Sequence, residues 1–201
     1  MKAVVWGFIL VAATASVRAQ ASAPALENED KAYGALQERI VERIRLWPGL
    51  APHETEASRG RFAYDEKRKV WRRYDVSCPE LVILRPAGTP RDTMVVVMPG
   101  GGYQSQHMGH ICRDSKPILD SGRWLAVLHY RIPRRAGRNI YAAPREDAAR
   151  AVRILRANAA KYGWSPEKIG AIGFAVALHG AELANEDKAY GALHARIVAR
   201  I

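Results

Sequence analysis

Three short apolar runs, separated by polar and helical stretches, limit the folds open to this chain. The runs cover residues 94–98, 124–128 and 169–174, and the first reads Met-Val-Val-Val-Met. Continuous β-branched runs of this length are typical of strands that are buried on both faces. Between the second and third runs, Pro144 opens the clearest helical pattern, with Glu146 and Asp147 in its first turn. The alternation predicts the α/β class, with a mostly parallel sheet flanked by helices.

The N-terminus has the pattern of a secretory signal peptide over residues 1–19. Lys2 precedes an apolar run over 3–16, and small residues surround Arg18. This run is shorter than the roughly 20 residues that span a bilayer. We therefore expect export with cleavage near Ala19, a secreted or periplasmic protein, and no membrane association after cleavage.

The first part of the mature chain predicts a helix followed by irregular structure and short strands. Asn28 precedes apolar residues at helical spacing from Tyr33 to Ile44, which favours one amphipathic helix. Residues 51–73 are polar and indicate an irregular segment. Short strands are expected over 74–76 and 80–84.

Two further expectations concern the middle of the chain. A loop rich in histidine follows the strand at 94–98, and a helix is expected around 115–121. In the helix that Pro144 opens, Asp147 and Arg150 lie three residues apart, which predicts an ion pair on one helical face.

The chain is basic, with 31 Lys and Arg against 20 Asp and Glu and a formal net charge of +11. The basic residues concentrate at 59–73 and 131–138. These runs lack an array of stacking aromatic residues and a nucleic-acid-binding motif. We therefore interpret them as solvated loops and expect no nucleic-acid partner.

The cysteines and histidines leave two alternatives open. Cys78 and Cys112 would enter an oxidising compartment, where they either form a disulfide or stay apart as small buried residues. His107, His110 and Cys112 are of types that bind zinc, but a fourth ligand is missing. The prediction is therefore no metal and no cofactor.

A glycine-rich turn and a second glycine motif carry the candidate chemistry. Pro99-Gly100-Gly101-Gly102-Tyr103 follows the first apolar strand, and the N–H groups of Gly101 and Gly102 are candidates for stabilising the oxyanion of a tetrahedral intermediate. The run over 173–177 has the layout of a G-x-S-x-G nucleophile elbow, with Ala175 at the serine position. Val176, the next residue, would supply a further oxyanion N–H.

Together these motifs resemble the α/β-hydrolase superfamily, and within it the exported acetylxylan-esterase-like carbohydrate esterases. The segments that carry the resemblance occur in the family's order: Pro99-Gly100-Gly101-Gly102-Tyr103, His129-Tyr130-Arg131-Ile132-Pro133, Asp147-Ala148-Ala149-Arg150-Ala151 and residues 169–179. The resemblance implies an incomplete α/β-hydrolase fold over residues 20–184, with the C-terminal strands missing. The implied reaction is serine-type hydrolysis of esters on acetylated plant polysaccharide.

The resemblance also implies that this chain lacks activity. In the family, the catalytic acid and base follow the nucleophile in the chain. After His179, this sequence has three acidic residues and one histidine, which we interpret as residues on a helix surface: Glu182, Glu186, Asp187 and His194. With Ala175 at the nucleophile position, we expect a pseudoenzyme. A non-catalytic saccharide- or protein-binding module and a recombined or truncated gene product remain alternatives. A rearranged Ser–His pair is a further one, drawn from two sets of residues: Ser105, Ser115 and Ser121; His107, His110 and His129.

An internal repeat occupies the end of the chain. Residues 185–201 match residues 28–44 at 14 of 17 positions, which predicts a second copy of the N-terminal helix. The match occurs once, so we do not interpret it as a repeat architecture. If the strand at 169–174 lies at the edge of the sheet, its free backbone groups favour self-association unless something covers them.

Overall fold

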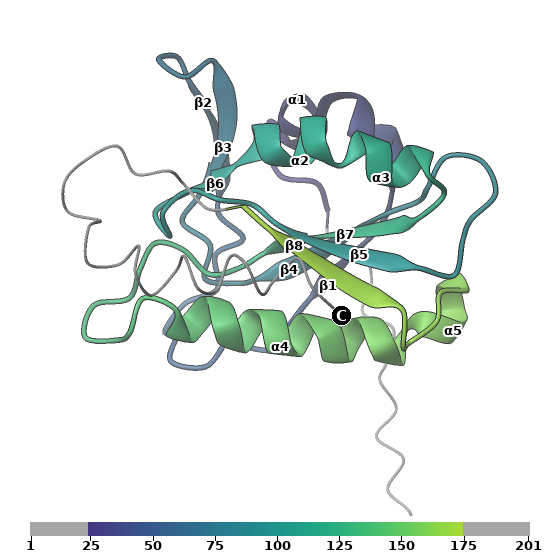
Figure 1. The fold of residues 1–201 in the computed structure, drawn as a ribbon. Helices are drawn as coiled ribbons and strands as arrows, with labels where there is room; N and C mark the ends of the chain where they lie inside the picture. The colour runs from purple at the N-terminus through teal and green to yellow at the C-terminus, as the bar shows by residue number, and fades with distance from the viewer. Residues whose placement is uncertain (1–23, 175–201) are drawn as a thin grey trace, which may run out of the picture.

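The computed structural model describes residues 24–174, which form a five-stranded mixed sheet between two helical layers, with a three-stranded sheet beside it (Figure 1). The elements in chain order are α1 (Glu29–Tyr33), the 3-10 helix η1 (Gly34–Arg39), β1 (Ile40–Arg45), β2 (Arg61–Asp65), β3 (Val70–Tyr74), β4 (Glu80–Leu84), β5 (Met94–Met98), β6 (Gln106–His107), α2 (Met108–Asp114), α3 (Lys116–Asp120), β7 (Trp124–His129), α4 (Ala142–Ala157), α5 (Ala159–Tyr162) and β8 (Ile169–Gly173).

The order of the strands confirms the α/β class. The large sheet runs β1-β4-β7-β5-β8, and β5 is parallel to both β7 and β8. Helices α2 and α3 connect β5 to β7, while α4 and α5 connect β7 to β8, as parallel neighbours require. On the other side, β4 is antiparallel to both β7 and β1, so the sheet is mixed.

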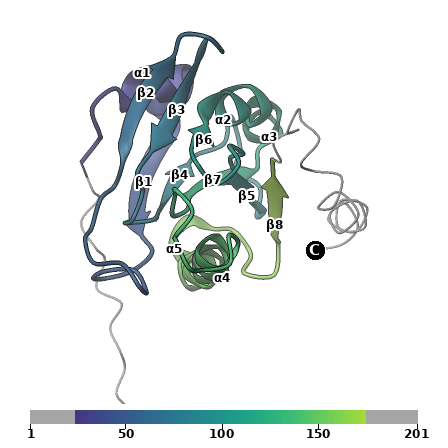
Figure 2. The ribbon, with the colours of Figure 1, turned by 90° about the vertical axis from the view of Figure 1, so that its left-hand side faces the viewer.

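Alternating side chains of the central strands fill two hydrophobic clusters, one on each face of the sheet. The face toward α4 takes the odd-numbered positions of β4 and the even-numbered positions of β7: Leu81, Ile83, Trp124, Ala126 and Leu128. The face toward α1, α2 and α3 takes the others: Val82, Leu84, Leu125 and Val127. Because both faces are covered, these strands read as continuous apolar runs in the sequence. Figure 2 shows the two helical layers on either side of the strands.

The expected single helix over 28–44 is wrong. Only 29–33 is α-helical, 34–39 is a 3-10 helix, and 40–45 is an edge strand that pairs with β4. Gly34 has φ +53°, which interrupts the helix. Ile40 and Ile44 share a face in a strand as well as in a helix, since a separation of four satisfies both periods. Pairing with β4 makes residues 40–45 a strand.

The segment 51–73 is not irregular throughout, because it contains the β2 strand and most of β3. These strands form a hairpin that pairs in register from Arg61 with Tyr74 to Asp65 with Val70, and β6 joins β3 on its other side. The hairpin carries few buried apolar residues, so its sequence lacks the alternation that marks a strand. The expected His-rich loop is likewise wrong in part, since 108–114 is the helix α2.

The basic runs are not simply solvated loops. Arg73 and Arg131 are fully buried within them. Arg73 pairs with buried Glu80 at 2.6 Å, and Arg131 pairs with buried Asp147 at 3.0 Å. The ion pair expected between Asp147 and Arg150 is therefore wrong: the Asp147 carboxylate faces Arg131, and Arg150 Nε donates to the carbonyl of Leu46.

The strand expected over 74–76 is wrong, because β3 ends at Tyr74 and Val76 forms only an isolated bridge with Ile132. The strand expected over 80–84 is β4. The helix predicted around 115–121 is α3, and the helix that Pro144 was expected to open begins two residues earlier, at Ala142. Within residues 24–174, none of the helices combines the length and the apolar character needed to cross a bilayer.

Candidate functional site

The glycine-rich turn lies where two parallel strands end side by side. It follows β5, and Phe174 follows β8, so both stand at the carboxyl edge of the sheet. Phe174 N donates to the carbonyl of Met98 at 3.1 Å, and a Cβ added to Gly100 would lie 2.5 Å from the Phe174 carbonyl oxygen. The structure thus brings the glycine turn against the residue that precedes Ala175. Ala175 and Val176 themselves lie outside the described residues.

The backbone of the turn requires glycine. Gly101 has φ +150° and Gly102 has φ +61°. A Cβ on Gly101 would lie 1.8 Å from the carbonyl oxygen of Ser105, so the chain folds back on itself at this position. The Gly101 carbonyl accepts from the N–H groups of Gln104 and Ser105, at 3.1 and 3.3 Å. Among residues 24–174, the N–H groups of Gly101 and Gly102 donate no hydrogen bond, as an oxyanion site requires.

Side chains from the segment after β7 support the turn. Tyr130 Oη donates to the carbonyl of Pro99 at 2.5 Å. The guanidinium of Arg134 donates to the carbonyl of Gly102 at 3.3 Å through Nη2. The ring of Tyr103 packs edge-on against those of Tyr130 and Tyr141. Both ends of the turn are therefore tied to the 130–141 segment, which begins with the Tyr-Arg motif.

A buried chain of hydrogen bonds connects the turn to the N-terminal segment. Gln106 Nε2 donates to the carbonyl of Tyr130 at 2.7 Å, so its Oε1 accepts from His129 Nδ1 at 2.5 Å. His129 Nε2 then accepts from Tyr33 Oη at 2.7 Å. Burial, reinforced by the nearby charge of Arg73, holds the pKa of His129 well below its usual value. His129 is therefore a neutral structural link.

His107 and His110 lie beside the turn. Their rings stack at 4.3 Å, and His110 stacks on Phe174 at 4.8 Å. His110 Nδ1 accepts from Gly100 N at 3.4 Å, and burial lowers the pKa of both imidazoles. Cys112 points elsewhere, its Sγ lying 3.2 Å from the Ala32 carbonyl oxygen. No group of three potential metal ligands gathers anywhere in residues 24–174.

The serines of the alternative Ser–His pair are engaged elsewhere or isolated. Ser105 Oγ accepts from Arg72 at 2.7 Å, and Ser121 Oγ donates to the carbonyl of Ile118 at 2.6 Å. Ser115 Oγ is buried without a partner among the described residues. In that part of the chain, no serine hydroxyl is hydrogen-bonded to a histidine, so the arrangement that activates a serine is not formed.

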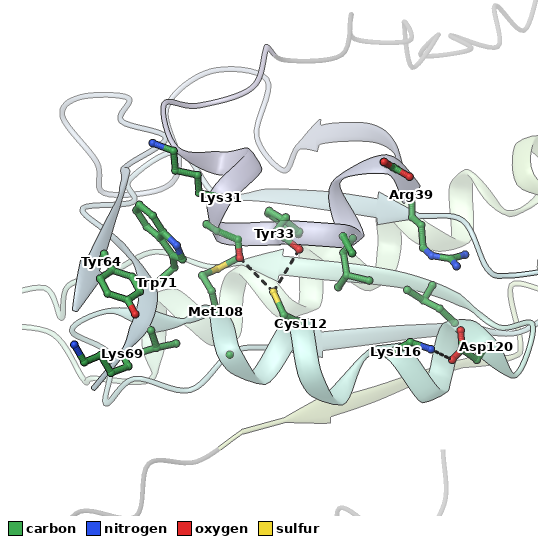
Figure 3. A pocket seen from close by; sticks show the side chains of 18 of the residues that line it. Lys31, Tyr33, Arg39, Tyr64, Lys69, Trp71, Met108, Cys112, Lys116 and Asp120 are labelled. Carbon is green, nitrogen blue, oxygen red and sulfur yellow. Dashed lines mark hydrogen bonds and ion pairs between the residues drawn. The ribbon is translucent and has the colours of Figure 1, made fainter. Parts of the chain in front are cut away.

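A separate pocket of about 690 Å³ lies between the N-terminal segment, helices α2 and α3, and the β2–β3 hairpin (Figure 3). Cys112 is one of the residues that line it, and five cationic residues line it as well: Lys31, Arg39, Lys69, Arg85 and Lys116. Both cysteines are free, and burial raises the pKa of Cys112 to about 11, which keeps the thiol protonated and unreactive near neutral pH. The pocket therefore offers no activated nucleophile.

Tyr33, Gln106 and Arg134 are the supporting residues that the sequence analysis missed. Tyr33 lies 96 residues from the histidine it contacts, and nothing local in the sequence marks that pairing. Arg134 was assigned to a solvated loop, although its contact with the Gly102 carbonyl places it at the turn.

Comparison with known proteins gives the following matches. Among solved structures, the acetyl ester-xyloside bifunctional hydrolase from Caldicellulosiruptor lactoaceticus is 25% identical, with a TM-score of 0.45, over 66% of this chain and 42% of its own. The propionate-bound esterase Est2 from the Planctomycetes species Thermogutta terrifontis is 25% identical, with a TM-score of 0.41, over 57% of this chain and 40% of its own. The chain thus spans less than half the length of these structures. No curated protein matches the chain. The family model BD-FAE matches residues 81–196, more than half of the sequence, and the chain therefore belongs to the BD-FAE family.

Proposed function

We propose that this chain is a carboxylic ester hydrolase by descent that retains an oxyanion-binding turn but does not hydrolyse esters. BD-FAE is an esterase-associated family. The observation that carries the proposal is the close approach of Gly100 to Phe174, the residue before the position that the resemblance assigns to the nucleophile. That position is Ala175.

The chemistry follows from the alanine. In serine-type acyl transfer, a hydroxyl oxygen attacks the ester carbonyl, its proton passes to a base, and the alcohol leaves. The methyl group of Ala175 has no lone pair and no proton to give, so no acyl-enzyme forms. The N–H groups of Gly101 and Gly102 stabilise charge only after such an attack.

The ancestral substrate that we propose is an acetylated plant polysaccharide, and the compartment is extracellular or periplasmic. The resemblance of the Pro99–Tyr103 and 169–179 motifs to exported carbohydrate esterases supports the substrate class. The signal-like pattern of residues 1–19 supports export.

Hydrolysis of p-nitrophenyl acetate tests the proposed inactivity. The purified chain should release p-nitrophenol no faster than a heat-denatured sample of itself, while an active serine esterase in the same buffer shows that the assay works. Turnover well above the denatured control overturns the proposal. Loss of such turnover in a Gly101→Ala variant that is still folded, but not in Gly88→Ala, would place the unexpected reaction at the turn.

A second candidate function is non-catalytic binding of acetylated saccharides at the same turn. The N–H groups of Gly101 and Gly102, which have no acceptor among the described residues, favour it. Calorimetric titration with acetylated xylo-oligosaccharides should then show saturable binding without release of acetate. Gly101→Ala should abolish the heat, whereas Gly88→Ala, at φ +62° with nothing within 4 Å, should not. No saturable heat with the unaltered chain counts against this function.

A further inference from the structure

The N-terminal segment, residues 28–44, covers a surface of the large sheet. We call this surface the docking slot. The docking slot is made by the edge of β4 that pairs with β1, together with Phe62, His129 and helix α2. Tyr33 is fully buried in it, its ring lies edge-on to Phe62 at 6.4 Å, and its hydroxyl donates to His129. Ala32 and Leu36 are also buried in it. The segment thus binds its surface as a peptide ligand would, through apolar anchors and a β-pairing.

The segment also carries its own internal brace. Glu29 is buried, and its carboxylate pairs with Arg43 at 3.1 Å and accepts from the N–H of Leu26 at 3.0 Å. This brace holds α1 against β1 within the docking slot.

Residues 185–201 repeat every buried feature of the segment. Their counterparts to Glu29, Ala32, Tyr33, Leu36 and Arg43 are identical: Glu186, Ala189, Tyr190, Leu193 and Arg200. Leu183 also corresponds to Leu26 at the same offset. The repeat therefore offers the docking slot the same anchors and the same brace.

The three differences avoid the fully buried positions. Glu38 is exposed, and the repeat has alanine at the corresponding position. Gln37 corresponds to a histidine in the repeat, and its Oε1 has no partner among the described residues. Glu42 pairs with Lys161 at 2.8 Å, and its replacement by alanine removes that ion pair. The repeat therefore fits the docking slot but lacks one contact that residues 28–44 make.

The repeat can reach the docking slot of its own chain. The segment enters at the carboxyl edge of the sheet, where Tyr33 meets His129 at the end of β7, and β8 ends at the same edge. The width of the sheet from β1 to β8 is four strand spacings, roughly 19 Å at about 4.8 Å each, and a path along its carboxyl edge is of this order (Figure 2). The ten residues 175–184 span up to roughly 33–36 Å when extended.

We propose that residues 185–201 are a second occupant of the docking slot in the same chain and exchange with residues 28–44. The occupied state shown in the structure is favoured because residues 28–44 continue directly into Leu46 and keep the Glu42–Lys161 pair. Weakening the N-terminal anchor shifts occupancy toward the repeat. This inference is independent of the proposed function.

Paired substitutions in the full chain test the exchange by urea unfolding. Tyr190→Ala alone should leave the midpoint unchanged, because the repeat is then the minor occupant. Tyr33→Ala should lower it, and Tyr33→Ala/Tyr190→Ala should lower it further, because the replacement is then impaired as well. The proposal is overturned if the urea midpoint of the double variant equals that of Tyr33→Ala. It is also overturned if the shift in the double variant is only the sum of the shifts in the two single variants.

Cross-linking reports the occupant directly. Cys112 Sγ lies 3.2 Å from the carbonyl oxygen of Ala32, so a thiol at its counterpart Ala189 should come close to Cys112 when the repeat is docked. In a Cys78→Ser background carrying Ala189→Cys, a short bismaleimide should link 189 to 112 within one chain, several-fold more in the Tyr33→Ala variant. A matched Ala181→Cys control, outside the repeat, should not respond to Tyr33→Ala. Absence of the link, or its appearance only between two chains, overturns the proposal.

Discussion

Replacing Gly101 by alanine is the sharpest test of the geometry of the glycine turn. The added Cβ would lie 1.8 Å from the carbonyl oxygen of Ser105 and 2.6 Å from its carbonyl carbon. These are backbone atoms, so no side-chain rotation relieves the overlap. The φ of +150° is itself unfavourable for an L residue, at roughly 1–3 kcal/mol. Moving Ser105 away also breaks its bond and that of Gln104 to the Gly101 carbonyl, at about 1 kcal/mol each.

The expected loss in the free energy of unfolding is therefore about 3–5 kcal/mol, measured by urea denaturation. Gly88→Ala is the matched control, because Gly88 also has a positive φ but meets nothing within 4 Å. It should cost about 1–2 kcal/mol. Amide exchange at His107, whose N–H donates to the Gly100 carbonyl at 2.8 Å, should accelerate in Gly101→Ala alone. Equal losses in the two variants, with His107 still protected, would refute the reasoning.

Three further predictions concern charge and titration. Burial holds the pKa of His129 below its ordinary value of about 6.5, so that below this pH the unfolded chain binds a proton that the folded chain does not. The urea midpoint should therefore be highest above pH 6.5 and fall toward pH 5.5. A flat profile contradicts the buried neutral imidazole. Glu80→Gln leaves the guanidinium of Arg73 buried without its counter-charge and should lower the free energy of unfolding in urea by about 3–5 kcal/mol. The control Asp75→Asn, in an exposed ion pair, should lower it by under about 1 kcal/mol. Similar losses in the two variants would show that the Glu80 pair is solvated. Alkylation of Cys112 by iodoacetamide, followed by peptide mapping, should keep rising with pH toward about 11, and a plateau near pH 8 would contradict the buried thiol.

The central strands were predictable because burial on both faces leaves a continuous apolar run in the sequence. Residues 94–98, 124–128 and 169–173 are strands in the structure, as expected. The helix after β7 was predictable for a similar reason, since its apolar stripe and first-turn acids are local features. The adjacency of the glycine turn and Phe174 then follows from parallel pairing of β5 with β8.

The N-terminal strand and the buried polar residues were not predictable, because distant partners determine them. Residues 40–45 form a strand that pairs with β4, although their spacing also suits a helix. Arg73 and Arg131 look like members of solvated basic runs until Glu80 and Asp147 are brought beside them. Sequence spacing carries no record of such encounters.

Three contacts within the described part of the chain hold the glycine turn in its conformation. Tyr130 holds the turn through the Pro99 carbonyl, Arg134 through the Gly102 carbonyl, and Ser105 through its own backbone. All three contacts join residues between Pro99 and Arg134, within the described part of the chain. A substitution at Gly101 should therefore change both the fold of the turn and any ligand bound to it.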